Sequence, residues 1–252
     1  MKTLTRKDIL TALQRAFLPQ PFALAMYEGG SAAFGRLDSG SDIDLQIVVQ
    51  DDAVELAAAL VEEALKPITE TEMRYILPAP TWHGHYQAFY RFKNASPLLL
   101  LDLCIIKLSS PNKFLEREIH GDALIYFDKC NAAVPAPFDA AGLQDTLQER
   151  REYNRVIFEL FSPFTKKELD RGNTIEAFAF FQGYVVTPLV ELLRIQYDPT
   201  RYNFRSRHIH YDLPREVVAR LEPFYYIKDT TDLMEKWVLG VQWIRQLLDA
   251  SG

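Results

Sequence analysis

A segment with two prolines and little hydrophobic periodicity, residues 131–139, divides this 252-residue chain into halves with different patterns. Before this segment, short apolar runs of strand length alternate with amphipathic stretches. After it, the apolar residues recur at helical spacing. Such a change of pattern favours two domains over one. The sequence therefore predicts an N-terminal α/β domain over residues 1–132 and an all-helical domain over residues 133–252.

The pattern in each half also predicts individual elements. In the first half, helices are expected over residues 7–17 and 53–65, and strands over residues 22–27, 43–49, 70–77, 85–92 and 98–106. In the second half, helical spacing covers residues 143–161, 174–197 and 230–248. Asn173-Thr174 and Asp229 or Thr230 are the expected caps of the last two helices. Pro188 lies inside the middle one and predicts a kink there.

Charge and cysteine content limit the environment and the partners. Lys plus Arg number 28 against 34 Asp plus Glu, a formal net charge of −6. A protein that binds a long nucleic-acid backbone normally carries the opposite balance, so no nucleic-acid partner is expected. Two distant cysteines favour a reduced, cytoplasmic setting. The longest strongly apolar run, Leu98–Ile106, is interrupted by Asp102 and is too short to cross a bilayer, so no membrane association is expected.

The segment from Gly29 to Leu45 carries the most chemical information. Gly30-Ser31 follows an apolar strand, where glycine lets a ligand approach the backbone and free amides at a helix start suit a phosphate. Asp42 and Asp44 are two residues apart at the start of the next strand, so both carboxylates point to the same face. They repel unless a cation neutralises them, and Mg²⁺ is a hard ion that takes oxygen ligands.

Each half of this segment has a structural alternative. Gly30-Ser31 alone favours an ordinary turn, and the acidic pair alone favours a solvated strand entry. The two together, followed by the apolar run after Asp44, favour a binding site for phosphate and metal.

Asp102 is the third indication, because it lies in the middle of an otherwise apolar strand. An unpaired buried carboxylate costs several kcal/mol or becomes protonated. One explanation is a structural carboxylate bonded to the backbone. The favoured one places Asp102 on a strand beside Asp42 and Asp44, where the three carboxylates share metal ions in a site for nucleotidyl transfer.

Gly30-Ser31, Asp42-Ile-Asp44 and the later strand residue Asp102, in this order, resemble the motif of the DNA polymerase β-like nucleotidyltransferase superfamily. Within it, the chain is most similar to the small-molecule branch, which includes aminoglycoside and minimal nucleotidyltransferases. The resemblance covers residues 20 to 107. It implies a fold of the α+β class, with a mixed-sheet nucleotidyltransferase domain followed by an all-α domain.

The resemblance also implies a role for each matching residue. Gly30 and Ser31 would bind the β- and γ-phosphates of a nucleotide, and Asp42, Asp44 and Asp102 would be catalytic and hold two Mg²⁺ ions. Many minimal members carry an arginine where this chain has Phe34. Arg36, two positions later, is therefore the expected contact to the triphosphate from this segment.

The second half contributes a basic segment, Arg194 to His210. Arg201 and Arg205 are its candidate triphosphate contacts, since arginine binds phosphate in a bidentate manner. A solvated, salt-bridged connector is the slightly favoured alternative. The pairs His83/His85 and His208/His210 lack a third ligand at fixed spacing, so a transition-metal site is not favoured at either.

These observations predict an enzyme that transfers a nucleoside monophosphate from an NTP, with ATP the expected donor, to a hydroxyl of a small molecule. An aminoglycoside-like antibiotic is one such acceptor. Two alternatives stay open: an antitoxin-like enzyme that transfers AMP to a protein, and a nucleotide-binding module without turnover.

Overall fold

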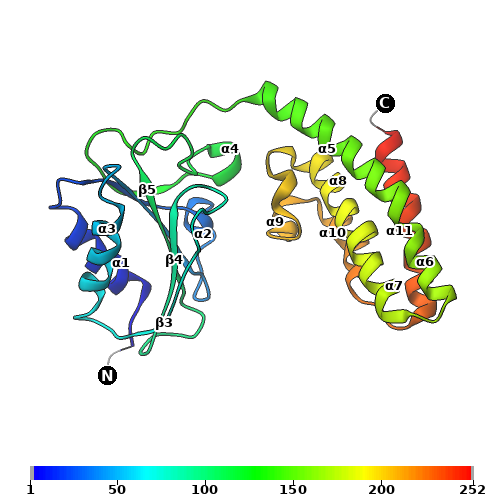
Figure 1. The fold of residues 1–252 in the computed structure, drawn as a ribbon, viewed down its shortest axis with the longest axis horizontal. Coiled ribbons are helices and arrows are strands. Elements are labelled where there is room, and N and C mark those ends of the chain that lie inside the picture. The colour runs from blue at the N-terminus through cyan, green and yellow to red at the C-terminus, as the bar shows by residue number, and fades with distance from the viewer. Residues whose placement is uncertain (1–2, 251–252) are drawn as a thin grey trace. The chain divides into compact units, whose positions relative to one another are not determined.

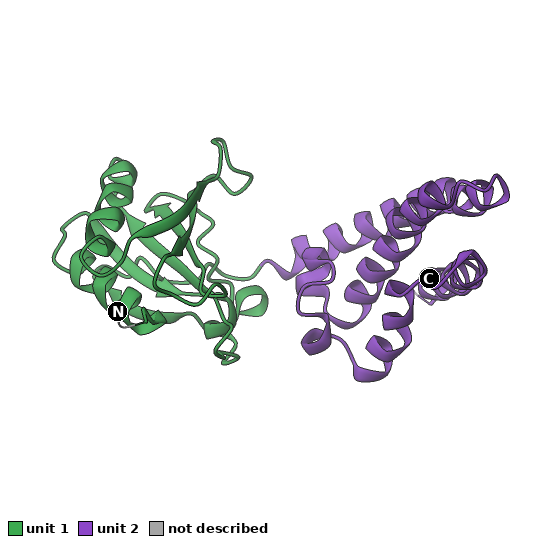
Figure 2. Cartoon of the chain, turned by 90° about the horizontal axis from the view of Figure 1, so that it is seen from below, with its two compact units in different colours: residues 1–138 green, residues 139–252 purple. Residues whose placement is uncertain are grey.

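The computed structural model describes residues 3–250 and separates into two compact units, residues 1–138 and 139–252 (Figures 1 and 2). The sequence predicts a boundary at 132/133 instead. Ala133 is buried in the first unit, where it packs with Ala132 against residues of the sheet. The segment after residue 132 thus contributes to the packing of the first unit before the chain continues into the second.

The first unit is built on one six-stranded sheet with the strand order β3-β4-β5-β2-β1-β6. The strands are β1 (Ala23–Glu28), β2 (Ile43–Val49), β3 (Thr71–Ile76), β4 (Tyr86–Phe92), β5 (Leu101–Lys107) and β6 (Leu124–Asp128). β2 and β5 are parallel, and all other neighbours are antiparallel. With the helical second unit, this confirms the predicted α+β fold with a mixed sheet.

Alternation along the strands creates two different faces. Ile43, Leu45 and Ile47 of β2 are fully buried in the main core, which α1 (Arg6–Phe17) and α3 (Val54–Leu65) complete. Figure 1 shows these two helices on the same side of the sheet. The intervening residues Asp44 and Gln46 point to the other face. The period of two in β2 therefore places a polar row opposite the helices.

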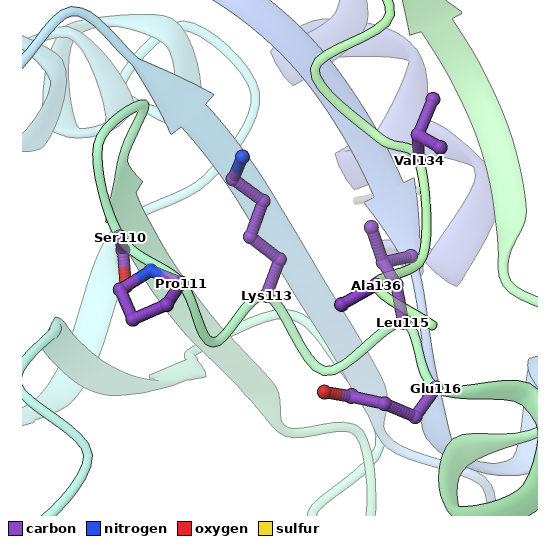
Figure 3. A pocket seen from close by; sticks show the side chains of 7 residues that line it. All are labelled: Ser110, Pro111, Lys113, Leu115, Glu116, Val134 and Ala136. Carbon is purple, nitrogen blue, oxygen red and sulfur yellow. The ribbon is translucent and has the colours of Figure 1, made fainter. Parts of the chain in front are cut away.

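The second face is covered in part by the chain between β5 and the second unit. Tyr27, Cys104 and Ile106 form a smaller core with Leu115 there, and α4 (Arg117–His120) lies in the same segment. A pocket of about 160 Å³ opens between these loops (Figure 3) and is lined by Ser110, Pro111, Lys113, Leu115, Glu116, Val134 and Ala136. The part of this face near β3 and β4 is not covered by these core residues.

The second unit consists of helices around its own core. They are α5 (Ala140–Phe161), α6 (Pro163–Asp170), α7 (Thr174–Phe181), α8 (Thr187–Tyr197), α9 (Ile209–Asp212), α10 (Arg215–Leu221) and α11 (Thr230–Asp249). Two short 3₁₀-helical segments lie between them: η2 (Pro199–Phe204), which is kinked at Arg201, connects α8 to α9, and η3 (Glu222–Tyr225) connects α10 to α11. Asp229 caps α11 as predicted, because its side chain accepts a hydrogen bond from the N–H of Asp232 at 2.9 Å.

The predicted long apolar helix is one continuous run, Thr174–Tyr197, with a π-helical turn η1 (Gln182–Val186) in its middle. Pro188 follows this turn. Proline lacks an N–H and its ring collides with a carbonyl one turn back, so a wider turn just before it lets the helix continue. By length and composition alone the run could cross a membrane, but 56% of its most apolar window is buried in this unit.

Candidate functional site

Two of the predicted site carboxylates lie side by side on neighbouring strands. Asp44 of β2 and Asp102 of β5 are register partners in the parallel pair. Partners in such a pair point to the same face of the sheet, and neighbouring strands are about 4.8 Å apart. This face is the one opposite α1 and α3. The fold thus brings together two aspartates that are distant in the sequence.

Gly30 lies directly against Asp44. It begins the one-turn helix α2 (Gly30–Ala33), and the N–H of Gly29 before it donates to the carbonyl oxygen of Asp44 at 2.9 Å. The φ angle of Gly30 is +52°, and a Cβ at this position would overlap the carboxylate of Asp44. Only glycine fits both requirements. The predicted phosphate-binding turn is therefore in contact with a predicted metal ligand.

A chain of hydrogen bonds holds Asp102. Gln87 of β4 donates from Nε2 to Asp102 Oδ1 at 2.6 Å, and its Oε1 lies 2.9 Å from His83 Nε2. The backbone N–H of His85 donates to His83 Nδ1 at 3.1 Å. His83 Nδ1 is therefore an acceptor, which leaves Nε2 as the donor to Gln87. In each of the three hydrogen bonds the donor belongs to the residue farther from Asp102 along the chain of bonds. The last donor, Gln87 Nε2, therefore fixes the orientation of the Asp102 carboxylate.

The surroundings of Asp102 favour its neutral form. Burial raises the pKa of Asp102 above its ordinary value, the hydrogen bond from Gln87 opposes this, and the nearby charge of Asp42 raises the pKa further. Asp42 directly precedes β2 and is half-buried. All three predicted carboxylates thus lie at one end of the β2–β5 pair, where a bound cation would favour their charged forms.

A cation from the first helix also lies at this end of the sheet. Arg6 of α1 donates to the carbonyl oxygen of Asp42 and forms an ion pair with Glu28, whose side chain is 1% exposed. Tyr126 of β6 donates to Glu28 Oε2 at 2.6 Å. Burial lowers the pKa of Arg6, while the charges of Asp44 and Asp42 act in the opposite direction. Arg6 thereby ties α1 to the start of β2.

The carboxylates of Asp42, Asp44 and Asp102 are of the ligand type that Mg²⁺ takes, but they do not form a complete set of metal ligands in the described part of the chain. Within residues 3–250, no group of three or more His, Cys, Asp or Glu side chains is placed to hold a metal. Gln87 holds Asp102, and Gly30 lies against Asp44. Carboxylate oxygens are ligands that Mg²⁺ prefers. The two predicted Mg²⁺ ions remain a prediction.

Ser31 and Arg36 lie beside the same turn. Ser31 is half-exposed in α2, and its carbonyl oxygen accepts the N–H of Arg36 at 2.8 Å. The guanidinium carbon of Arg36 lies 4.9 Å from the centroid of the Phe34 ring. Arg36 therefore packs on Phe34, the position at which the sequence resemblance implies an arginine in many minimal nucleotidyltransferases. Its contact with a triphosphate remains a prediction.

The basic segment of the second unit is organised by Arg194, which is fully buried. Arg194 binds Asp198 Oδ2 at 3.0 Å and Asp212 Oδ2 at 3.2 Å, and it also donates to the carbonyl oxygens of Arg205 and Arg207. Arg201 pairs with the same two aspartates, each at 3.1 Å. This arrangement matches the salt-bridged alternative for Arg201. The side chain of Arg205 is exposed, and nucleotide binding by either residue remains a prediction.

Comparison with known proteins adds a likeness in structure. The sequence matches neither a family model nor a curated protein. Spectinomycin adenyltransferase AAD(9) from Enterococcus faecialis, crystallised with ATP and spectinomycin, matches over 97% of this chain and 100% of its own, with 10% identity and a TM-score of 0.38. The GLD-2/RNP-8 complex matches over 90% of this chain and 65% of its own, with 14% identity and a TM-score of 0.33.

A third structure, of a candidate nucleotidyltransferase from H. pylori, matches over 99% of each chain with 14% identity and a TM-score of 0.29. The descriptions of the first and third structures agree with the nucleotidyltransferase resemblance predicted from the sequence. At such TM-scores the likeness carries no argument about residues, donor or acceptor.

Sequence reasoning did not find several residues of this site. Gln87 lies on the polar face of β4, between positions that the alternation of Tyr86–Phe92 assigns to the core, so the period of two could have indicated it. Arg6 and Glu28 carry no such signal. Their pairing depends on where α1 docks against the sheet, which the local pattern does not contain.

Proposed function

We propose that this chain is a Mg²⁺-dependent nucleotidyltransferase that transfers a nucleoside monophosphate, with ATP the expected donor, to a hydroxyl group of a small molecule. One observation carries the proposal: the Gly30 backbone is in contact with the carboxylate of Asp44, and Asp102 is its neighbour in register. A turn open to phosphate, beside oxygen ligands for a divalent cation, is the combination that phosphoryl chemistry requires.

Each group has a defined part in the reaction. The turn at Gly30-Ser31 would bind the phosphates through backbone amides and the Ser31 hydroxyl. Asp42, Asp44 and Asp102 would hold the metal, which when bound neutralises charge on the phosphates. Asp102, oriented by Gln87, would receive the proton of the acceptor hydroxyl. A bond forms between the acceptor oxygen and the α-phosphorus, the bond from the α-phosphorus to its bridging oxygen breaks, and pyrophosphate leaves.

Pyrophosphate release is the test. The purified chain is incubated with Mg²⁺, each NTP in turn and a library of hydroxylated small molecules. Asp44→Asn is compared with Asp52→Asn, which alters an exposed carboxylate in the turn after β2. Asp44→Asn is expected to lower turnover at least about a hundredfold, because it removes a ligand charge and keeps the shape, whereas Asp52→Asn keeps the normal rate. Equal rates in the two variants would overturn the assignment.

Binding of Mg²⁺-ATP without pyrophosphate release in any mixture would instead favour a nucleotide-binding module. Release only in the presence of a second protein would favour transfer of AMP to that protein.

A further inference from the structure

Helix α5 carries a second apolar stripe in addition to the side that faces its own core. Leu147 and Phe158 are buried in the core of the second unit. Tyr153, Val156 and Leu160 recur at spacings of three and four residues on another side of the helix, where they are 50%, 41% and 59% exposed. A surface helix of a globular protein typically has one apolar side. A second stripe at this spacing is typical of a helix that packs against another helix.

Helix α6 extends the exposed stripe. The backbone stays in the right-handed helical region at Ser162, with φ −58° and ψ −32°, and Pro163 is the first residue of α6. The helical course therefore continues from α5 into α6, with the bend that a proline introduces. Phe164 lies four residues after Leu160, so the two side chains are on the same side of this course. The stripe thus extends from Tyr153 to Phe164.

Four half-buried aromatic rings widen the apolar surface beside the stripe. Phe161, Phe164, Phe180 and Tyr184 come from α5, α6, α7 and η1 and form a closed set of ring contacts, with centroids 5.0–5.8 Å apart. Among the described residues, none of the four belongs to a core cluster. The contacts join the helices, but a broad exposed apolar surface of this kind also marks a protein–protein interface.

The two ends of the stripe carry charges of opposite sign. Glu149 is exposed and lies four residues before Tyr153, on the same side of α5. Lys167 lies three residues after Phe164, and its Nζ is 4.9 Å from the centroid of that ring. A second copy packed antiparallel on the stripe brings Glu149 of each chain to Lys167 of the other. A parallel arrangement would place like charges side by side, so the charge pattern selects the antiparallel one.

We propose that this stripe is the interface of a symmetric dimer, in which α5 and α6 of two copies pack antiparallel. A two-fold axis uses the same surface on both chains. The register that joins Glu149 to Lys167 also places Val156 opposite Leu160, because both pairs are centred on residue 158. The apolar side chains then lie in the middle and the charges at the rim, as in stable interfaces. Such an interface takes about 800 Å² from each copy, so the aromatic rings beside the stripe are expected to be covered as well.

Sedimentation velocity of the full chain, from about 100 nM to about 100 μM, tests for the dimer. Leu160→Lys puts a charge in the middle of the stripe, and Leu239→Lys is the matched control, because Leu239 of α11 is 54% exposed. We expect a concentration-dependent dimer of the native chain. Leu160→Lys should raise its Kd at least about a hundredfold, and Leu239→Lys should leave the Kd within about twofold. A native chain that is monomeric throughout this range, or equal Kd values for the two variants, would overturn the interface.

Charge reversal tests the antiparallel register with side chains at the rim. Glu149→Lys and Lys167→Glu each place like charges opposite one another, so each should raise the Kd of the dimer about tenfold. The double variant restores the opposite charges and should return the Kd to within about threefold of the native value. A double variant that dimerises no better than the single ones would contradict the proposed packing.

Discussion

At the scale of single residues, Gly30 is a position where the backbone conformation and the neighbouring Asp44 carboxylate both exclude a side chain. Gly30→Ala is expected to lower the free energy of unfolding, because the added Cβ collides with Asp44 in addition to the strain of a positive φ. Gly35→Ala is the matched control: its φ is +63°, and nothing lies within 4 Å of its Cβ position. Backbone strain alone costs about 1–3 kcal/mol. Urea unfolding should show a larger loss of unfolding free energy for Gly30→Ala than for Gly35→Ala. Equal losses would contradict a close approach of Asp44 to Gly30.

The stability of the metal-free protein should depend on pH through Asp102. Burial raises the pKa of Asp102 in the folded protein, so this carboxyl group ionises more readily in the unfolded chain. The free energy of unfolding therefore falls as the pH rises from the pKa of Asp102 in the unfolded chain to its higher pKa in the folded protein. Asp102→Asn avoids this loss and retains an oxygen that can accept the hydrogen bond from Gln87. With a chelator present, the variant should be at least as stable as the native chain at neutral pH. That advantage should shrink in mild acid.

Thermal unfolding at both pH values, alongside pyrophosphate release, distinguishes the two explanations for Asp102. A variant that unfolds more easily yet keeps the normal rate would show a structural carboxylate instead of a catalytic one.

Gln87 is a positioning residue, and its effect should appear in kcat. Gln87→Met keeps the length of the side chain and removes the donor to Asp102. We expect kcat to fall about 10–100-fold, as for other residues that orient a ligating group, with little change in the KM for NTP. Gln87→Asn keeps an amide on a shorter side chain, so its kcat should lie between those of the native chain and Gln87→Met. An unchanged kcat in Gln87→Met would show that Asp102 needs no orientation.

At the scale of elements, the connection between α8 and α9 depends on one buried cation. Arg194→Met leaves Asp198 and Asp212 without their central partner and frees two carbonyl oxygens. Removal of one member of a buried ionic network costs about 3–5 kcal/mol. Arg205→Ala, at an exposed side chain in the same segment, should change stability little. Comparable unfolding curves for the two variants would contradict a structural role for Arg194.

At the scale of the whole molecule, the exposed part of the connecting segment should be the first site of proteolysis. Residues 134–137 are exposed, whereas Ala132 and Ala133 just before them are buried. Brief digestion with chymotrypsin, which cleaves after aromatic residues, should therefore cut first after Phe138 at the end of this segment, because the Val134–Pro135 and Ala136–Pro137 bonds precede proline and resist serine proteases. Mass spectrometry of the early products tests this. First cuts inside β2 or α8 would contradict the division into two units.

The sequence predicted most of the regular elements because their signals are local. The strand over residues 43–49 agrees with β2 at both ends, since its alternation and its neighbouring turn lie in the same short window. β6 was not predicted, because it is a five-residue edge strand with Leu124 and Ile125 exposed. The proximity of Asp44 and Asp102 could be inferred from their residue types. The bonds from Gln87 and Arg6 could not, because they depend on sheet register and helix docking.

The single parallel pair in the sheet also has a consequence for the order of events during folding. β2 and β5 are adjacent in space, but α3 and the β3–β4 hairpin lie between them in the chain. The hairpin and the helix can form from nearby residues, whereas closing the β2–β5 ladder requires a long loop and is slow. Asp44 and Asp102 therefore meet only near the end of folding. A nascent chain released before β5 emerges would hold the Gly30 turn without its second carboxylate.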